Sequence, residues 1–375
     1  MSMLRPSWQC ILASLLAVVA IFMLPLANPP VDQAAPAVSS LMSIAAIALV
    51  LAACVLDGTA LSVGAKAGVH LVAAHVAVWL LFGEIAPANG IARPAFFIML
   101  AACWLLAWRC VTLLSSLPTT NLLRLAIPTL FGLWILILWE AVVRGAGIPL
   151  ILLPPPSAIW ARILGSLPIL GADVVQTVFK AVLIGYALGC AGGFVTAILA
   201  DRFDFLRRGL IPIGNLVSAL PIIGVAPIMV LWFGFDWPSK AAVVVIMTFF
   251  PMLVNTVAGL AASGHMERDL MRTYASSYWQ TLFKLRLPAA MPFIFNALKI
   301  NSTLALIGAI VAEFFGTPVV GMGFRISSEM GKMNVDMVWA EIAVAALAGS
   351  VFYGVIALIE RTVTFWHPSM RRHPA

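Results

Sequence analysis

The sequence predicts an all-α polytopic membrane protein with about ten transmembrane helices. Of the 375 residues, 62% are hydrophobic and only 10% are charged, whereas a soluble domain carries about 25% charged residues. Apolar runs recur along the whole chain, and several exceed the about 20 residues that a membrane-spanning helix needs. The alternating segments of about 10 residues that build a transmembrane β-barrel do not occur in the sequence.

The apolar runs, and the turn-forming segments between them, place the individual spans. We interpret the first run, Cys10 to Leu26, as a span and not as a signal peptide, because it is longer than the usual hydrophobic region of about 7–15 residues. The predicted spans cover about residues 8–26, 40–57, 65–83, 94–115, 123–143, 174–200, 209–235, 238–263, 289–316 and 336–362.

Lysine and arginine residues gather in alternate loops between these spans. Since cytoplasmic loops carry the excess of these residues, we expect both chain termini to be cytoplasmic. The same distribution explains the net charge of +7 without a nucleic-acid partner. All five cysteines lie in apolar runs. We therefore expect them to be small buried apolar residues, and we expect no metal site.

The loop lengths and the number of polar residues in the spans change near residue 120. The first four spans have short loops and almost no polar residues, whereas the last six have longer loops and most of the polar ones. We therefore predict that residues 1–120 form an N-terminal four-helix membrane extension of unknown role and that residues 121–375 form a six-helix domain. Because the extension has an even number of spans, the six-helix domain still begins on the cytoplasmic side of the membrane. The extension can therefore precede this domain without inverting its orientation.

An amphipathic stretch, RTYASSYWQTLFKLRLPAAMP (Arg272 to Pro292), separates the eighth and ninth predicted spans. Its helical pattern puts apolar and polar residues on opposite halves, and Pro288 favours the start of a new helix. A basic helix of this kind can lie in the lipid headgroup region, dock on a cytoplasmic partner, or serve only as a linker. The residue pattern by itself leaves these alternatives open.

The same stretch resembles the conserved cytoplasmic loop of ATP-binding-cassette importer permeases, whose pattern is E-A-A-x3-G-x9-I-x-L-P. Here the pattern reads Asp269-Leu270-Met271, then Ala275, then Leu285-Arg286-Leu287-Pro288. The neighbouring stretches PIIGVAPIMVLWFGF, FFPMLVNTVAGL and LPAAMPFIFNALKINSTLALIGAIVAEFFG are similar to permeases of the nitrate, sulfonate and taurine group. That group includes transporters for riboflavin and for pyrimidine precursors of thiamine. The resemblance covers about residues 121–370.

The resemblance implies that residues 264–288 are a coupling loop, which sits in a groove on a cytoplasmic ATPase subunit. The family's glycine permits a turn between two short helices, and Ala275 replaces it here. Alanine is disfavoured at positive φ, so we expect either an ordinary helical conformation at Ala275 or a shallower bend. The residues expected to couple to the ATPase are Asp269, Arg272, Ala275, Ser276, Ser277, Leu285, Leu287 and Pro288.

The sequence contains no G-x-x-x-x-G-K-[ST] motif, so we expect no ATP hydrolysis and no bound cofactor in this chain. The resemblance implies that separate ATPase subunits use the ATP, that a second permease chain completes a homodimer or heterodimer, and that a soluble periplasmic or lipid-anchored binding protein delivers the substrate. The chain would then be an importer permease of the bacterial inner membrane, surrounded by lipid, that moves a small organic solute inward.

Polar residues inside spans are candidates for the substrate pathway, because they are costly in a membrane. Lys299, Ser302, Thr303 and Glu313 share one stripe of the ninth span, and Asn255 lies in the eighth. The alternative is that Glu313 meets water at the outer end and that Lys299 extends towards the cytoplasmic surface. An ion- or proton-coupled secondary transporter is the alternative function, but it usually shows internal repeats, which we do not find.

Overall fold

The computed structural model describes residues 6–27, 37–85, 92–118, 120–218, 220–316 and 319–366. Both termini, whose cytoplasmic location is predicted above, lie outside these ranges. The elements are, in order, α1 (Trp8–Phe22), α2 (Ala37–Asp57), α3 (Val63–Ile85), α4 (Pro94–Ser115), α5 (Asn121–Gly145), α6 (Pro156–Gly165), α7 (Leu167–Val174), the π-helical η2 (Val175–Val182), α8 (Leu183–Arg202), α9 (Asp204–Ser218), α10 (Ile222–Phe233), α11 (Trp237–Ala261), α12 (His265–Thr273), α13 (Tyr278–Thr281), the π-helical η3 (Leu282–Arg286), α14 (Leu287–Glu313), α15 (Met322–Gly331) and α16 (Val335–Val363).

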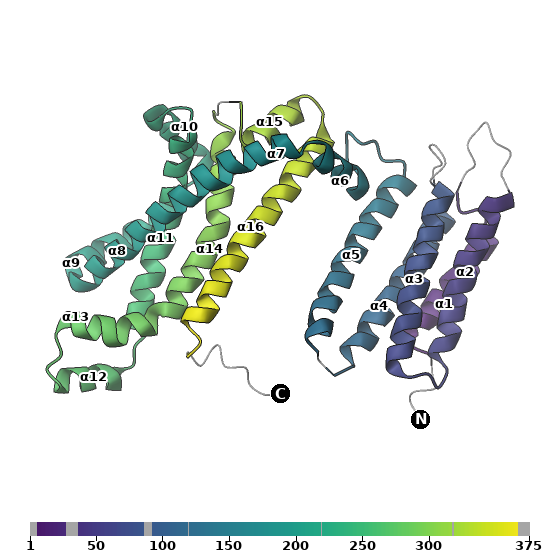
Figure 1. Ribbon diagram of the computed structural model, residues 1–375, viewed down its shortest axis with the longest axis horizontal. Helices are drawn as coiled ribbons and strands as arrows, with labels where there is room; N and C mark the ends of the chain where they lie inside the picture. Colours follow the sequence, from purple (N-terminus) through teal and green to yellow (C-terminus); the bar gives the residue numbers. More distant parts are fainter. Residues whose placement is uncertain are drawn as a thin grey trace. The chain divides into compact units, whose positions relative to one another are not determined.

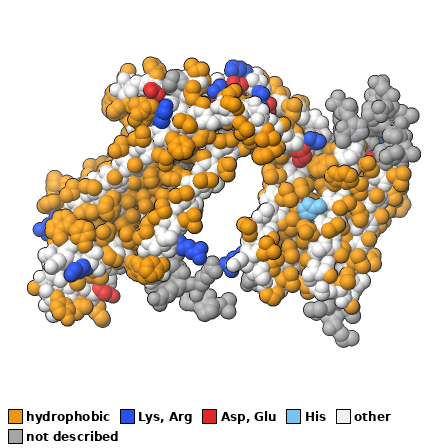
Figure 2. Space-filling view, viewed as in Figure 1, with side chains coloured by type: hydrophobic (Ala, Val, Ile, Leu, Met, Phe, Trp, Pro, Cys, Tyr) orange, Lys and Arg blue, Asp and Glu red, His pale blue; other side chains and the backbone are white. Residues whose placement is uncertain are grey.

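These elements confirm an all-α polytopic membrane protein. Within the described ranges, seven helical segments are long and apolar enough to cross a membrane, and three shorter apolar helices accompany them. Hydrophobic side chains cover most of the visible surface of each unit, and the charged side chains gather near the helix ends (Figure 2). The seven long segments are Val63–Ile85, Pro94–Ser115, Asn121–Gly145, Leu167–Arg202, Trp237–Ala261, Tyr278–Glu313 and Val335–Val363, and the shorter ones are Trp8–Phe22, Leu41–Asp57 and Ile222–Phe233.

Contacts divide the chain into two units, residues 1–161 and 162–375. In unit 1, α1 to α4 pack on one another through small residues such as Ala13, Ala17 and Ala74, all fully buried. Small side chains let helix backbones approach closely. Helix α5 packs on α4 and buries Trp134 in the same core. The contact boundary therefore falls within α6, whereas the functional division after residue 120 stays a prediction.

In unit 2, helices α8, α11, α14 and α16 lie side by side (Figure 1). Helix α8 approaches α11 along a row of glycines. A Cβ atom on Gly189 would lie 2.0 Å from the Thr248 hydroxyl, and one on Gly193 would lie 2.4 Å from the Phe249 carbonyl oxygen. The Asn301 side chain of α14 donates to the Thr248 carbonyl of α11 at 2.8 Å. Close backbone packing and this hydrogen bond hold the three helices together.

The predicted span 209–235 is not one continuous helix. The structure ends α9 at Ser218 and begins α10 after Pro221, which is the N-cap residue of α10 in an extended conformation. Proline lacks the backbone N–H that a continuous helix would use and clashes with the preceding turn. Residues 209–235 therefore form two shorter helices joined at a break.

Candidate functional site

The candidate site is the loop that joins α11 to α14. After α11 ends at Ala261, the chain forms α12, α13 and η3 before α14 begins at Leu287. Helices α12 and α13 lie at the lower end of unit 2 in Figure 1, beneath α11 and α14. The segment that resembles the coupling loop thus projects beyond the membrane-spanning helices of this unit.

Ala275 makes the bend between α12 and α13. Its φ is +50°, which is the left-handed region that favours glycine. The Ala275 N–H donates to the Arg272 carbonyl at 2.9 Å, and the Ser276 N–H donates to the Met271 carbonyl at 3.0 Å. This pair of bonds is the Schellman motif that ends many helices. The ordinary helical conformation expected for Ala275 is therefore wrong, because the two hydrogen bonds fix a left-handed turn despite the Cβ atom.

A new helix begins directly after this bend. The Ser277 hydroxyl accepts a hydrogen bond from the Gln280 N–H at 3.3 Å, and the Gln280 side chain accepts one from the Ser277 N–H at 2.9 Å. This reciprocal arrangement is a capping box, which satisfies two N–H groups at a helix start. Only four residues separate the end of α12 at Thr273 from the start of α13 at Tyr278, and the loop is two helices joined by a fixed turn.

The base of the loop is anchored to the ends of α8 and α11. The Arg286 guanidinium binds both carboxylate oxygens of Asp201, at 2.7 and 2.6 Å, and its Nε donates to the Leu260 carbonyl at 3.0 Å. The Tyr278 hydroxyl also donates to Asp201, at 2.9 Å, and the Arg202 guanidinium lies 4.8 Å from the Tyr278 ring centre. A bidentate arginine–carboxylate pair fixes both distance and orientation.

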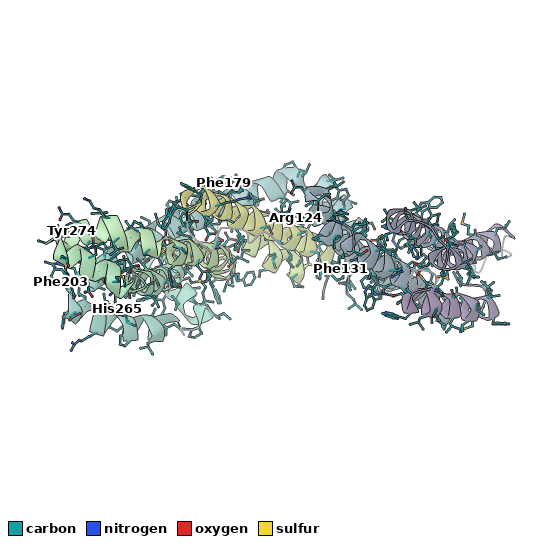
Figure 3. The ribbon with its side chains drawn as sticks, turned by 90° about the horizontal axis from the view of Figure 1, so that it is seen from below. Arg124, Phe131, Phe179, Phe203, His265 and Tyr274 are labelled. Atoms are coloured by element: carbon teal, nitrogen blue, oxygen red, sulfur yellow. The ribbon has the colours of Figure 1, made fainter. Side chains whose placement is uncertain are left out.

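The tip of the loop, in contrast, faces outward. Every residue of α12 is at least partly exposed. Asp269 and Arg272 form an exposed ion pair at 3.5 Å, and Tyr274 is 75% exposed. Figure 3 shows Tyr274 and His265 at this end of unit 2. A polar, solvent-facing helix with an exposed aromatic residue is suited to bind a partner.

The eight predicted coupling residues separate into two groups in the structure. Five belong to the outward part, where all are exposed except the half-buried Ser276. The other three are half-buried where η3 joins α14. The outward group is Asp269, Arg272, Ala275, Ser276 and Ser277, and the inner group is Leu285, Leu287 and Pro288.

Sequence reasoning missed Asp201, the residue on which the base of the loop depends. It lies 85 positions before Arg286 in the chain, and the two meet only after α8, α11 and α14 pack. Arg286 itself occupies the variable position of the family pattern. The one signal in the sequence was an acidic residue at the predicted cytoplasmic end of a span.

The candidate pathway residues do not form one polar site. Lys299 pairs with Glu360 of α16 at 2.7 Å, so it is tied to a neighbouring helix. Ser302, Thr303 and Asn255 each donate to a carbonyl of their own helix, at 2.7, 2.8 and 2.8 Å. Hydroxyl and amide groups that bond within their own helix are already satisfied.

Glu313 lies at the opposite end of α14 from the loop and is only 2% exposed. Its carboxylate accepts from the Thr177 hydroxyl at 2.7 Å and from the Gly323 N–H at 2.7 Å. The suggestion that Glu313 simply meets water at the outer end is therefore wrong. Because α15 packs over it, the residue holds the first turn of that helix.

Two further backbone N–H groups attach the start of α15 to its neighbours. The Gly321 N–H donates to Asp173 at 2.6 Å, and the Met322 N–H donates to the Thr177 hydroxyl at 2.9 Å. Arg325, one turn later, pairs with Asp173 at 2.8 Å. The free N–H groups at the start of a helix favour negatively charged partners. Buried carboxylates from α7 and α14 supply them here.

Two charged side chains of α15 titrate away from their ordinary range. The hydrogen bond to Asp173 raises the pKa of the Arg325 guanidinium. Hydrogen bonds from Asn334 and Lys332 hold the pKa of the Glu329 carboxyl below its usual value. Both groups are therefore ionised at neutral pH: Arg325 ties α15 to Asp173 of α7, and Glu329 bonds to Lys332 and Asn334 in the turn that follows α15.

The chain matches the family described as "Binding-protein-dependent transport system inner membrane component" over residues 189–365. It is 32% identical to the formylaminopyrimidine transport permease protein of Halalkalibacterium halodurans, an alignment that covers 64% of this chain and 95% of that protein. The chain belongs to this family. The matched residues include the loop between α11 and α14 and the helices α14, α15 and α16.

Two more relatives are named for the transport of other compounds. The chain is 28% identical to the riboflavin transport system permease protein of Chloroflexus aurantiacus, over 63% of this chain and 88% of that protein. It is 27% identical to the taurine transport system permease protein of Escherichia coli, over 67% and 92%. Helices α1 to α7 lie before the family match. The permease is a membrane-spanning component of a binding-protein-dependent transport system.

Proposed function

We propose that this permease is the transmembrane subunit of an ATP-driven importer and that it moves a small organic solute inward by alternating access. In this mechanism ATP binding closes two ATPase subunits, which pull on residues 269–288 and shift the spans between inward-open and outward-open states. The ATPase subunits use the ATP, and this chain binds no cofactor. Family membership supports the transport role, and the form of the loop supports the coupling mechanism.

The observation that carries the proposal is the contrast within the loop between an exposed tip and an anchored base. A partner can reach Asp269 and Arg272 on α12, which are exposed. The same loop is bound through Arg286 to Asp201 of α8 and to the Leu260 carbonyl of α11. A force applied to α12 is therefore passed to the ends of two packed spans.

The partners follow from the same proposal. Six core spans form half of a pathway, so a second permease chain, identical or different, completes it. A soluble periplasmic or lipid-anchored binding protein meets the outer surface, where α15 and the residues up to Asp336 lie. This arrangement requires the N-terminus and the C-terminus to be cytoplasmic.

For the substrate we propose a small heterocyclic compound. Two relatives carry the names of formylaminopyrimidine and riboflavin transport, and both of these compounds contain a pyrimidine-type ring. Specificity in such a system depends on the binding protein. The ligand is best found by thermal-shift screening of the binding protein that copurifies with the complex.

Uptake into proteoliposomes tests the function. The purified chain is reconstituted with its native ATPase and permease partners, and binding protein with its ligand is added. We expect uptake that requires ATP and the binding protein and that vanadate inhibits. Uptake that an uncoupler abolishes, and that persists when the ATPase is inactive, would show a secondary transporter instead.

A further inference from the structure

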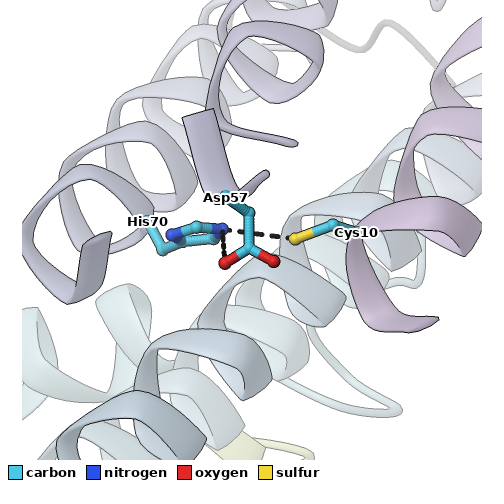
Figure 4. Close-up of side chains that lie close together, drawn as sticks. All are labelled: Cys10, Asp57 and His70. Atoms are coloured by element: carbon cyan, nitrogen blue, oxygen red, sulfur yellow. Dashed lines mark hydrogen bonds and ion pairs between the residues drawn. The ribbon is translucent and has the colours of Figure 1, made fainter. Parts of the chain in front are cut away.

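A thiol, an imidazole and a carboxylate from three helices meet inside unit 1. Cys10 of α1, Asp57 at the end of α2 and His70 of α3 are 1%, 0% and 0% exposed. The Cys10 sulfur lies 3.3 Å from Nε2 of His70, and this nitrogen lies 3.9 Å from Oδ1 of Asp57. Figure 4 shows the three side chains directed at one another. Their donor atoms all lie within 4.8 Å of one another.

The histidine ring is oriented as in a metal site. Its Nδ1 lies 2.7 Å from the carbonyl of Lys66, one helical turn earlier. A carbonyl oxygen only accepts hydrogen bonds, so the neutral ring carries its proton on Nδ1. The lone pair of Nε2 then faces Cys10 and Asp57. A hydrogen bond from the second ring nitrogen to a carbonyl is the usual support of a metal-binding histidine.

The carboxylate is held in a similar way. Oδ2 of Asp57 accepts the Ser7 N–H at 2.9 Å, and Oδ1 accepts Nε of Arg109 at 3.0 Å. Each carboxylate oxygen keeps a second lone pair after these bonds. Arg109 and Lys66 bring positive charge close to Asp57, and Asp57 together with a Cys10 thiolate supplies two negative charges for the ion. Arg109 is partly exposed, so solvent screens part of its charge.

The dimensions fit a tetrahedral ion. Zn²⁺ binds thiolate sulfur at about 2.3 Å and imidazole nitrogen or carboxylate oxygen at about 2.0–2.2 Å, which separates neighbouring donors by about 3.3–3.6 Å. The Cys10–His70 and His70–Asp57 distances of 3.3 and 3.9 Å are close to these values, and the widest separation of the three donors, within 4.8 Å, must shorten by about 1 Å when the ion binds. A cavity of about 520 Å³ borders Cys10 and Cys54. Asp57 and His70 do not line this cavity, so it reaches the cluster only at Cys10.

We propose that Cys10, Asp57 and His70 bind one Zn²⁺-type divalent ion. On binding, the Cys10 thiol releases its proton to solvent, and the sulfur, Nε2 and Oδ1 donate lone pairs to the ion. The set of one sulfur, one nitrogen and one oxygen ligand suits a borderline-soft d¹⁰ ion better than Mg²⁺ or Ca²⁺, which prefer oxygen ligands. The bound ion joins α1, α2 and α3 at one end of unit 1.

Cobalt substitution tests this proposal on the full-length chain in lipid nanodiscs. Co²⁺ bound by a thiolate gives a sulfur-to-metal charge-transfer band in the near ultraviolet. We expect one equivalent of Co²⁺ per chain to produce this band, and one equivalent of Zn²⁺ to abolish it. Wild-type protein that shows no band, and retains no zinc by elemental analysis, would overturn the proposal.

Matched variants assign the band to the cluster. Cys10→Ser and His70→Gln should each lose it. Cys103→Ser should keep it, because Cys103 is equally buried but lies outside the cluster. His75→Gln should also keep it, although His75 makes the same Nδ1 contact to a carbonyl, that of Leu71. A band that persists in both Cys10→Ser and His70→Gln would place the ion elsewhere and overturn the proposal.

Discussion

The helical segment formed by α7, η2 and α8 carries an aspartate near each end, and the two aspartates hold different kinds of loop. Asp201 binds Arg286 at the base of the coupling loop, which leaves α12 exposed beyond the contact. Asp173 binds Arg325 and also accepts the Gly321 N–H, which fixes α15 by its first turn. One end therefore leaves α12 exposed, and the other end holds α15 against the neighbouring helices.

The comparison shows how two aspartate–arginine pairs can serve two different purposes. At the Asp201 end, which is predicted to be the inner end, the pair and the Tyr278 hydroxyl are the main polar contacts of the loop with α8. At the Asp173 end, which is predicted to be the outer end, the pair is one part of a network that includes Thr177 and Glu313. The two attached segments differ in burial: every residue of α12 is at least partly exposed, whereas Gly321, Met322 and Gly323 at the start of α15 are buried.

The largest expected effect comes from removing one partner of the inner pair. Asp201→Ala leaves Arg286 without its partner at a site where the two side chains are 5% and 16% exposed. Loss of one member of a buried pair costs about 3–5 kcal/mol. We expect a clear fall in thermal stability in detergent and loss of ATP-coupled uptake. The double variant Asp201→Ala/Arg286→Ala should be more stable than the sum of the single changes. Strict additivity would show that the two residues do not interact.

The next effect tests the outer end. A Cβ atom on Gly323 would lie 2.1 Å from the Ile310 carbonyl, so Gly323→Ala must move α15 away from α14. Overpacking of this kind costs about 1–3 kcal/mol. Hydrogen exchange should report loss of protection across 321–331. Gly331→Ala, in the same helix but with open space around it, is the control, and an equal loss in both variants would contradict the close contact.

A smaller effect of opposite sign is expected at the bend of the coupling loop. Ala275→Gly removes the about 1–2 kcal/mol that a side chain costs in the left-handed region, against about 0.4–1 kcal/mol of added freedom in the unfolded chain. We expect the loop to gain roughly 0.5 kcal/mol, measured as slower hydrogen exchange across 265–281. Ala262→Gly, at a residue with a φ of −76°, should lose stability. Destabilisation by both changes would argue against the Schellman turn.

The smallest effect on stability should occur at the tip. The ion pair of Asp269 and Arg272 is exposed at 3.5 Å, and exposed pairs contribute about 0–1 kcal/mol. Asp269→Ala should therefore leave the unfolding temperature nearly unchanged and weaken binding of the purified ATPase subunit. Glu267→Ala, on the other side of α12 by helical spacing, is the control. Undiminished ATPase binding to a variant that lacks the whole loop would disprove docking.

The spans could be predicted from sequence because a bilayer demands long apolar helices, and the coupling loop because its spacing resembles that of a family. Pro221 marks the break before α10 in the sequence, because proline interrupts a continuous helix. The conformation of Ala275 could not be predicted in this way, because hydrogen bonds to Arg272 and Met271 decide it. The burial of Glu313 and the meeting of Cys10 with His70 depend on contacts between helices distant in the chain, which residue patterns do not contain.

The close approach of α8 to α11 has a mechanical consequence. At Gly189 and Gly193 the two backbones meet with almost no side chain between them, so there is little room for one helix to slide along the other. We expect α8 and α11 to move together as one rigid unit, with Asp201 and Leu260 at the same end. In the proposed mechanism, a movement passed through Arg286 would then rotate both helices together, without a series of small rearrangements across the membrane.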